Sequence, residues 1–344
     1  MLPARGGASH PKQRCLHAPW ACSLPQGHVP PGPEFSGSRH GYCRSISAER
    51  ATLLLTGATG FVGGELLRAL RSGERVRCLV RDASKLQDSD GLDTVEADLG
   101  EPDSLEPALE GVREVYYLVH SMEPGVEGGF AEQDRQAAEN FCDIAGRCGV
   151  QRTIYLGGVT GSGEQSEHLS SRGEVEDILR ECSEEFVALR ASMIVGAASA
   201  SFGTLVQLVD RLPALLLPTW REHRVQPVAI EDVVAALVAA RDVPPGAYEI
   251  AGPDILTFEE MTEVVAELLG QAHRSLSLPF SSSKIEATAA SAVVDADREL
   301  LEPLLEGLHE DLLVENNALQ AVLGVEPTPF VDAARSALEA MDLQ

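Results

Sequence analysis

Short apolar stretches alternate with longer amphipathic ones between residues 51 and 196. The short stretches are typical of buried strands, and the longer ones, whose apolar residues recur every three or four positions, are typical of helices. This pattern predicts strands at 51–56, 75–80, 94–97, 114–119, 152–156 and 185–190. Helices are predicted between them at 61–72, 84–87, 102–110, 129–148 and 171–182. Repeated strand–helix units imply a parallel sheet covered on both faces, which is the doubly wound α/β arrangement.

The alternation loosens after Gly196. Helical periodicity returns at 202–212, 231–241, 257–269, 330–341 and over most of 284–320, with short strands predicted at 224–228, 247–250 and 275–278. Thr257 and Glu260 have the spacing of a capping box at a helix start. We expect residues 197–344 to form a smaller α/β substrate lobe, interleaved with the core of residues 51–196. It would lie over the carboxyl ends of the strands, where open α/β sheets bind ligands.

Residues 1–50 differ in kind from the rest of the chain. They are rich in Pro, Gly, Ser and His, show no periodicity, and carry more basic than acidic residues. They lack the apolar run of a secretory signal, and the prolines at 30, 31 and 33 oppose the amphipathic helix of a transit peptide. We predict a disordered extension. A translation start assigned too far upstream would give the same composition.

A glycine-rich turn, TGATGFVG at residues 56–63, joins the first predicted strand to the first predicted helix. In such a unit, backbone amides at the helix N-terminus meet the pyrophosphate of a dinucleotide. Gly57 would allow the tight turn, Gly60 the approach of the phosphates, and Gly63 the close packing of helix on strand. The sequence therefore predicts a Rossmann-type NAD(P) site. Its cofactor-binding residues in this turn are Gly57, Thr59, Gly60, Phe61, Val62 and Gly63.

The second predicted strand ends in Arg81 and Asp82. An acidic residue there would hydrogen-bond the ribose 2′-hydroxyl of NAD, whereas an arginine accommodates the 2′-phosphate of NADP. Arg81 lies nearer the expected position, so we predict NADP as the cofactor in preference to NAD. Asp82 leaves NAD as an alternative cofactor. A surface arginine without a binding role would also fit the position of Arg81.

The third and fourth predicted strands end in further candidates for the same site. The Asp98 carboxylate would accept a hydrogen bond from the adenine amino group, and the backbone N–H of Leu99 would donate one to the ring. The alternative for Asp98 is a helix-capping role. Val119 would flank the ribose and nicotinamide. His120 follows it, and a lone histidine is more often structural than catalytic.

The composition restricts the choice of binding partners more than it restricts the fold. The formal net charge is −26 and the pI about 4.6, so the surface repels nucleic-acid phosphate and anionic lipid, and we expect a small-molecule substrate instead. The seven cysteines are scattered and include no C-x-x-C pair. We therefore expect free thiols in a reducing compartment, the cytoplasm. No apolar stretch approaches the ~20 residues of a membrane-spanning helix.

The glycine turn, Arg81 and Asp98-Leu99 together resemble the short-chain dehydrogenase/reductase superfamily, in its extended and atypical branches. YLVHSM at 117–122, SRGEV at 171–175 and RASMIVG at 190–196 are similar to the atypical NmrA-like group. Within that group they resemble bacterial proteins related to the nucleotide-binding accessory subunit of respiratory complex I. The resemblance covers roughly residues 51–341 and implies the fold and the cofactor class, but not the substrate.

The chain departs from this superfamily at the catalytic residues. Active members carry a Ser after the fifth strand and a Tyr-x-x-x-Lys pair on the next helix, whereas this chain has Gly157 and Gly158 and no such pair. The i, i+4 spacing of His168 and Arg172 would place both on one helical face, as a substitute proton donor and a holder of a ribose hydroxyl or phosphate. Thr160 would offer a hydroxyl to a substrate carbonyl. The alternative is a structural histidine and an arginine paired with Glu176.

Three functions fit these predictions. The first is an NADPH-dependent reductase of a carbonyl or quinone. The leucine-rich stretch 205–217 would suit a hydrophobic, quinone-like substrate, a partner or a membrane edge, but such a stripe is more often part of core or lobe packing. The second is a non-catalytic NAD(P)-binding sensor or assembly protein, which the missing Tyr/Lys pair favours. The third, epimerase or dehydratase chemistry, depends on the missing tyrosine. Related folds often pair through sheet-flanking helices, so we expect a monomer or a homodimer.

Overall fold

The computed structural model describes residues 52–71, 75–86, 92–120, 129–159, 167–211, 215–217, 222–271, 275–277 and 311–341. For residues 130, 167–169, 215–217 and 275–277 only the backbone is described. The predicted disordered extension, Thr160 and residues 284–310 of the predicted helical region therefore lie outside the described residues.

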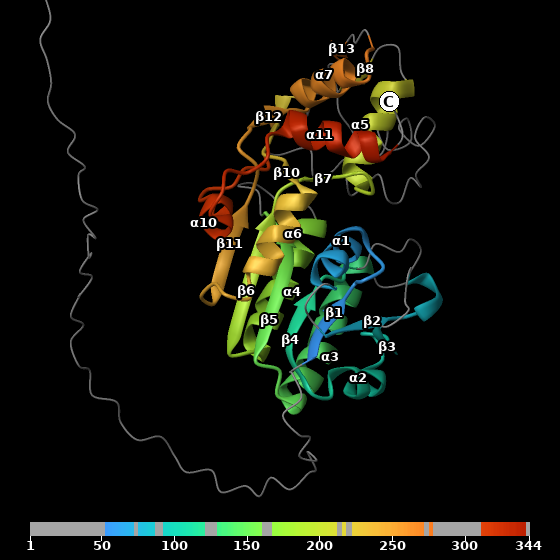
Figure 1. The fold of residues 1–344 in the computed structure, drawn as a ribbon, viewed down its shortest axis with the longest axis vertical. Helices are drawn as coiled ribbons and strands as arrows, with labels where there is room; N and C mark the ends of the chain where they lie inside the picture. Colours follow the sequence, from blue (N-terminus) through green and yellow to red (C-terminus); the bar gives the residue numbers. More distant parts are fainter. Residues whose placement is uncertain are drawn as a thin grey trace, which may run out of the picture. The chain divides into compact units, whose positions relative to one another are not determined.

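A seven-stranded sheet in the order β3-β2-β1-β4-β5-β6-β11 forms the centre of the fold (Figure 1). Every neighbouring pair in it is parallel. Its strands are β1 (Thr52–Thr56), β2 (Val76–Val80), β3 (Asp93–Glu96), β4 (Val112–Tyr117), β5 (Arg152–Gly158), β6 (Glu185–Ala191) and β11 (Gly246–Ile250). The predicted doubly wound α/β fold is confirmed. The fourth strand ends two residues earlier than predicted, so Leu118–His120 lie beyond its end.

Helices cover both faces of this sheet. One face carries α1 (Phe61–Leu70), α6 (Ile230–Ala239) and α10 (Leu319–Leu323). The other carries α2 (Pro102–Leu109), α3 (Gly129–Cys148) and α4 (Glu167–Cys182). A 3₁₀ turn, η1 (Ala83–Lys85), follows β2.

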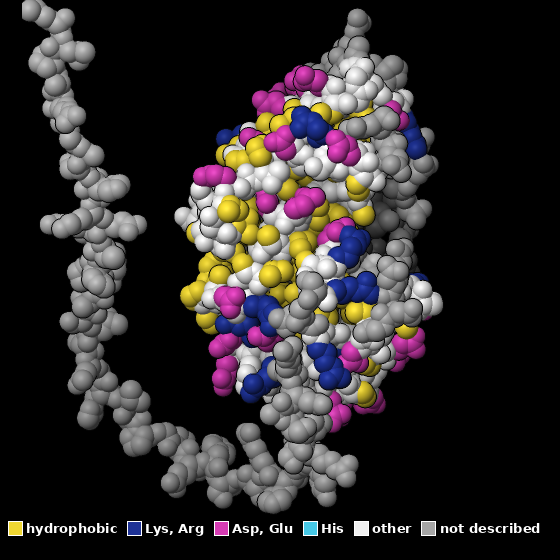
Figure 2. All heavy atoms as spheres, in the orientation of Figure 1, with side chains coloured by type: hydrophobic (Ala, Val, Ile, Leu, Met, Phe, Trp, Pro, Cys, Tyr) yellow, Lys and Arg dark blue, Asp and Glu magenta, His cyan; other side chains and the backbone are white. Residues whose placement is uncertain are grey.

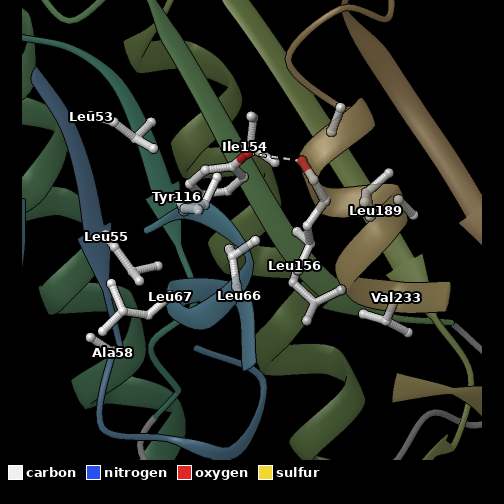
Figure 3. Packing of buried hydrophobic residues seen from close by; sticks show 14 of the residues in the cluster. Leu53, Leu55, Ala58, Leu66, Leu67, Tyr116, Ile154, Leu156, Leu189 and Val233 are labelled. Carbon is white, nitrogen blue, oxygen red and sulfur yellow. Dashed lines mark hydrogen bonds between the residues drawn. The ribbon is translucent and has the colours of Figure 1, made fainter. Parts of the chain in front are cut away.

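Alternate residues of each strand enter the two cores, as the period of two along a strand requires. In β1, Leu53 and Leu55 pack with α1 and α6 (Figure 3), and Leu54 packs on the other face with α2 and α3. Both faces of the strand are apolar, and this explains the uninterrupted apolar run in the sequence. Tyr116 lies in the first core and donates its buried hydroxyl hydrogen to the carbonyl oxygen of Leu237 at 2.9 Å, which ties α6 to β4.

A third core forms from segments that follow β6. It packs α5 (Ala200–Arg211), α7 (Phe258–Leu268) and α11 (Phe330–Ala340) on the paired strands β7 (Ile194–Val195) and β10 (Val228–Ala229). The strands β9 (Arg224–Val225) and β12 (Leu256–Thr257) pair antiparallel, and β8 (Leu215–Leu217) and β13 (Ser275–Ser277) pair parallel. The predicted capping box is confirmed, because Thr257 Oγ1 accepts from the amide of Glu260 at 3.1 Å and the Glu260 carboxylate accepts from the amide of Thr257. The boundary at residue 196 stays a prediction.

Arginines satisfy the helix ends that lie beside the amino ends of the strands. Arg77 donates to the carbonyl oxygens of Ala108 and Glu110 at the end of α2, at 3.0 and 2.9 Å, and to the Asp93 carboxylate at 3.0 Å. Arg152 donates to the carbonyl oxygens of Ala240 and Val243 after α6, both at 3.1 Å. The last carbonyls of a helix have no partner within the helix, so these arginines supply the missing donors.

The prediction that all cysteines are free thiols is wrong for one pair. Cys142 of α3 and Cys182 of α4 form a disulfide, with their Cα atoms 5.0 Å apart. The two cysteines are 40 residues apart, and only the packing of α3 beside α4 brings them together. Cys78 and Cys148 are not part of a disulfide.

Acidic, basic and hydrophobic side chains are mixed on the surface in view (Figure 2). On the face drawn in Figure 2, the acidic side chains of the described residues are scattered among basic and hydrophobic ones and do not gather in one patch. Within the described parts of the chain, no helix combines the length and apolar character needed to cross a membrane.

Candidate functional site

The order of the strands reverses at the carboxyl ends of β1 and β4. The chain runs outward from β1 to β2 and β3 on one side, and from β4 to β5 and β6 on the other. Open α/β sheets bind ligands at such a reversal. Thr56 fixes the two strand ends here, because its hydroxyl donates to the carbonyl oxygen of Tyr116 at 3.1 Å and accepts from the amide of Leu118 at 3.0 Å.

The glycine turn follows β1 directly. Gly57 has a φ of +71°, and a Cβ there would lie 2.8 Å from the carbonyl oxygen of Leu118. The Gly60 amide donates to the carbonyl oxygen of Gly57 at 2.9 Å. A Cβ at Gly63 would lie 2.1 Å from that same oxygen, so the first turn of α1 packs on the backbone of the glycine turn. Any side chain at Gly57 or Gly63 would force this backbone apart.

The N-terminus of α1 has the features of an anion site. Its N-cap is Gly60, which contributes no side-chain capping bond, and α1 starts with Phe61 and Val62. Thr59 and Gly60 are exposed at this point. The first amides of the helix therefore have no competing side-chain cap at the carboxyl end of β1. The residues present fit the pyrophosphate of a nicotinamide dinucleotide.

Phe61 has a packing role in addition to its place in the turn. A Cβ at Gly196 would lie 2.6 Å from the ring of Phe61 and 2.9 Å from the side chain of Ile230. The aromatic ring thus lies against the backbone of the segment that leads out of β7, and it links the glycine turn to the third core. Phe61 and Val62 are both half-buried.

The acid and the arginine at the end of β2 have different environments. Asp82 caps η1, since its carboxylate accepts from the Ser84 amide at 2.9 Å and from the Ser84 hydroxyl at 2.6 Å. These two hydrogen bonds hold the pKa of Asp82 below its usual value. Arg81 precedes it and is exposed.

Asp98 also takes part in a local turn. Its carboxylate accepts from the Gly100 amide at 2.8 Å, and its own amide donates to the Ser104 hydroxyl at 3.0 Å. Leu99 is buried, and its carbonyl oxygen accepts from the side-chain amide of Asn140 at 2.8 Å. Asp98 and Arg81 follow neighbouring parallel strands, so both lie at the same edge of the sheet. Their roles toward a nucleotide stay predictions.

A cluster of polar side chains lies beyond β4, on the face that carries α3 and α4. The ring of His120 lies 5.6 Å from that of Tyr155, its Nε2 contacts the carbonyl oxygen of Leu156 at 3.0 Å, and its Nδ1 lies 4.0 Å from Oδ2 of Asp134. Asp134 is only 6% exposed. The hydroxyl of Tyr155 donates to the backbone carbonyl oxygen of Arg172 at 3.0 Å. Four separate segments therefore meet here.

Sequence reasoning did not select Asp134, although the chain carries a signal for it. The buried residues of α3 include Ala137, Ala138 and Phe141, which follow Asp134 at spacings of three, four and seven. Asp134 therefore lies on the buried face of an amphipathic helix. An acid at such a position needs a partner, because a buried charge without one is costly.

The alternative in which Arg172 pairs with Glu176 is wrong. Glu176 is buried and pairs with Arg190 of β6 at 2.8 Å and with Arg180. The Nε of Arg172 is buried and has no hydrogen-bond partner among the described residues. Burial lowers the pKa of Arg172, and the nearby Tyr155 and Asp134 oppose that shift.

The other predicted catalytic residues are less completely described. Helix α4 begins at Glu167, so His168 lies in its first turn, one helical turn before Arg172. The structure describes the backbone of His168 only, and Thr160 lies outside the described residues. Val119 is half-buried beyond the end of β4. The catalytic assignments of His168, Arg172 and Thr160 therefore stay predictions.

Comparisons with known proteins agree with this geometry. A family model described as NAD(P)H-binding matches residues 57–194. The chain is 27% identical over 253 residues to a ceramide reductase of Caulobacter vibrioides, which covers 72% of this chain and 78% of the relative. It is 25% identical over 300 residues to the mitochondrial NADH dehydrogenase (ubiquinone) 1 alpha subcomplex subunit 9 of Arabidopsis thaliana, which covers 80% of this chain and 73% of the relative.

A solved structure adds a likeness in fold. The NADPH-dependent quinone oxidoreductase of Escherichia coli, in complex with NADPH, superposes with a TM-score of 0.68 at 18% identity, over 82% of this chain and 98% of that one. Sheet, glycine turn and family match define a protein that binds a nicotinamide nucleotide on a Rossmann-type fold. These findings support the resemblance of the chain to the atypical short-chain dehydrogenases/reductases.

Proposed function

We propose that this protein is an NADPH-dependent reductase of a small hydrophobic substrate that carries a carbonyl or quinone group. The observation that carries the proposal is the position of the exposed Arg81 directly after β2. The Asp82 carboxylate is engaged by Ser84, while the neighbouring Arg81 is exposed at the edge where a Rossmann-type ligand has its adenosine ribose. An arginine in that place accommodates a 2′-phosphate.

In this proposal each residue of the site has a separate role. The amides at the start of α1 hold the pyrophosphate, Asp98 and Leu99 hold the adenine, and Val119 lies beside the nicotinamide. When it is bound, the cofactor supplies the hydride. Arg172 holds a ribose hydroxyl or the substrate oxygen, because its Nε has no hydrogen-bond partner among the described residues. His168, or water, supplies the proton, and Thr160 offers a hydroxyl to the substrate carbonyl.

The names of similar proteins support a reductase of an apolar substrate. The Caulobacter relative is described as a ceramide reductase, and the Escherichia coli structure as a quinone oxidoreductase complexed with NADPH. At 27% and 18% identity these names support a class of reaction and leave the substrate open.

A second candidate, a non-catalytic NAD(P)-binding accessory protein, has its own support. The chain lacks the Tyr-x-x-x-Lys pair, and Gly157 replaces a serine at the end of β5. The relative from Arabidopsis is a subunit of NADH dehydrogenase, and another, from Cyanophora paradoxa, is described as a photosystem II assembly factor. In this alternative the nucleotide would be a structural element.

Turnover of NADPH separates the two candidates. The full chain is mixed with NADPH and a panel of quinones and aldehydes, and absorbance is followed near ~340 nm, where the reduced nicotinamide absorbs. Oxidation of NADPH that depends on one class of acceptor supports the reductase. Tight NADPH binding without oxidation on any acceptor refutes it in favour of the accessory protein.

Arg81→Ala tests the choice of cofactor. We expect NADPH affinity to fall about tenfold, which corresponds to ~1.4 kcal/mol, while NADH affinity stays within twofold. Lys85→Ala is the matched control, because Lys85 is an exposed cation only four residues away in η1. Equal losses for NADPH and NADH, or an equal effect of Lys85→Ala, would refute the role of Arg81.

A further inference from the structure

The polar cluster beyond β4 has a feature that the proposed function leaves unused. His120 lies between two acceptors that come from different elements. Leu156 presents its carbonyl oxygen from β5, and Asp134 presents its carboxylate from α3. The side chains of His120 and Asp134 are 13% and 7% exposed, so water screens this pair only weakly.

The contact with Leu156 shows that Nε2 of the His120 imidazole carries a hydrogen. A backbone carbonyl oxygen can only accept, so Nε2 carries a hydrogen and donates it at 3.0 Å. The other ring nitrogen, Nδ1, is 4.0 Å from Oδ2 of Asp134. A buried carboxylate at that distance favours a proton on Nδ1 as well, and hence the charged imidazolium.

The other groups around the pair decide its net charge. Tyr117 of β4 and Tyr155 of β5 have raised pKa values, in both cases mainly through burial, so both stay neutral at physiological pH. Arg172 of α4 is charged and interacts electrostatically with Asp134. With neutral His120, the charges of Asp134 and Arg172 cancel. With charged His120, these three side chains, the charged ones of the cluster that the structure describes, carry one net positive charge.

The cluster lies next to the place where charge would develop in a reduction. Leu156 directly precedes Gly157 and Gly158, the last residues of β5, and β4 and β5 are neighbouring strands. In the reduction, the carbonyl carbon accepts a hydride and the π electrons of the C–O bond move to oxygen. The oxygen then takes a proton from water, and the nicotinamide is oxidised. A positive cluster at this edge stabilises the negative oxygen before it is protonated.

We propose that His120 is a positioning residue of the reductase site, whose charged form holds the end of β5 against Asp134 and adds the positive charge that favours hydride transfer. The proposal rests on the proposed reductase function. It assigns the pH dependence of turnover to His120 and predicts that turnover falls as pH rises through the titration of its imidazole. Cofactor binding through the glycine turn stays unaffected.

His120→Gln and Asp134→Asn test this assignment. Glutamine keeps an N–H donor for Leu156 but cannot be charged, so we expect a kcat about tenfold lower with a flat pH profile, and an NADPH KM within twofold of wild type. Asp134→Asn removes the carboxylate and should move the midpoint of the kcat profile, and of the His120 ring-proton titration seen by NMR, down by about one pH unit. His223→Gln is the matched control, because His223 also faces an aspartate, Asp311 at 3.6 Å, but is 41% exposed.

The outcomes separate this proposal from the reductase function. A wild-type protein inactive on every acceptor overturns both. If the His120→Gln variant turns over at the wild-type rate and keeps the wild-type pH profile, the role of His120 is overturned and the reductase function stands. An NADPH KM that rises as much as kcat falls shows a general structural defect and also overturns it. If His120→Gln does not fold, Asp134→Asn decides, and an unmoved NMR midpoint there refutes the proposal.

Discussion

Partly buried arginines at the two ends of the central sheet differ in their hydrogen bonding. At the amino end, Arg77 donates to three carbonyl oxygens and to the Asp93 carboxylate, and Arg152 donates to two carbonyl oxygens and to the Glu185 carboxylate. At the carboxyl end, Arg172 has a buried Nε without a hydrogen-bond partner among the described residues. The arginines at the amino end thus have acceptors for their hydrogen bonds, whereas Arg172 at the carboxyl end has a buried donor atom without one in the described part of the chain.

This difference indicates which end is built for stability and which for a ligand. A buried donor with every hydrogen bond made contributes to folding, whereas a buried donor without a partner costs free energy. Such a cost is tolerated where a ligand supplies the missing partner, and perturbed ionisable groups gather at functional sites. The contrast yields three predictions, which differ in the size of the effect that we expect.

The largest effect should come from replacing the arginines with methionine at either end. Arg77→Met leaves the end of α2 and Asp93 without their donor, so we expect a loss of about 2–3 kcal/mol in the free energy of unfolding. Arg172→Met should cost less than about 1 kcal/mol, because Nε has no hydrogen bond to lose and His120 can take a proton to balance Asp134. Denaturant unfolding measures both. Turnover should survive Arg77→Met and disappear in Arg172→Met.

The comparison of the two ends would fail if the arginine results were reversed. A larger loss of stability for Arg172→Met than for Arg77→Met would make Arg172 a structural residue. Full turnover in a folded Arg172→Met protein would remove it from the site.

Two neighbouring glycines of α1 give the next effect. Gly63→Ala places a Cβ 2.1 Å from the carbonyl oxygen of Gly57, so we expect a cost of about 1–3 kcal/mol and a loss of NADPH affinity. Gly64→Ala is the matched control, because its Cβ would meet the carbonyl oxygen of Ala58 at an ordinary 3.7 Å, and alanine favours the helix. Thermal unfolding and NADPH titration measure both variants. Equal behaviour of the two would refute the close packing of α1 on the turn.

The smallest effect concerns Cys78 in the sheet. Burial raises the pKa of its thiol to about 11, so it stays protonated up to about pH 10 and reacts slowly as a nucleophile. We expect no alkylation by iodoacetamide at pH 8 in the folded protein and full alkylation after unfolding, as measured by mass spectrometry. Cys142 and Cys182 should be alkylated only after unfolding and reduction. Labelling of these two without a reductant would contradict the disulfide.

Local patterns were sufficient to predict the sheet and the glycine turn. The strand β1, the turn and α1 lie within about twenty consecutive residues, and short-range sterics restrict each of them. The capping box at Thr257 was predictable for the same reason, since both partners lie three residues apart. Fold and cofactor class could therefore be predicted without knowledge of the tertiary structure.

The polar cluster could not be predicted in this way. His120, Asp134, Tyr155 and Arg172 come from four elements, and their proximity depends on how α3 and α4 pack against β4 and β5. The partner of Glu176 shows the same limitation. The spacing of Arg172 and Glu176 favoured a helical pair, but Arg190, from the neighbouring strand, takes the carboxylate.

The disulfide between α3 and α4 closes a covalent ring around part of the candidate site. Thr160, His168 and Arg172 all lie within the 40-residue separation of Cys142 and Cys182. By chain entropy, closing a loop of this length stabilises the fold by about 4 kcal/mol, because the unfolded chain has fewer conformations to gain. Reduction would thus lower the folded fraction without altering any contact in the cluster. The redox poise of the compartment, and not only its pH, would then set how much competent protein is present.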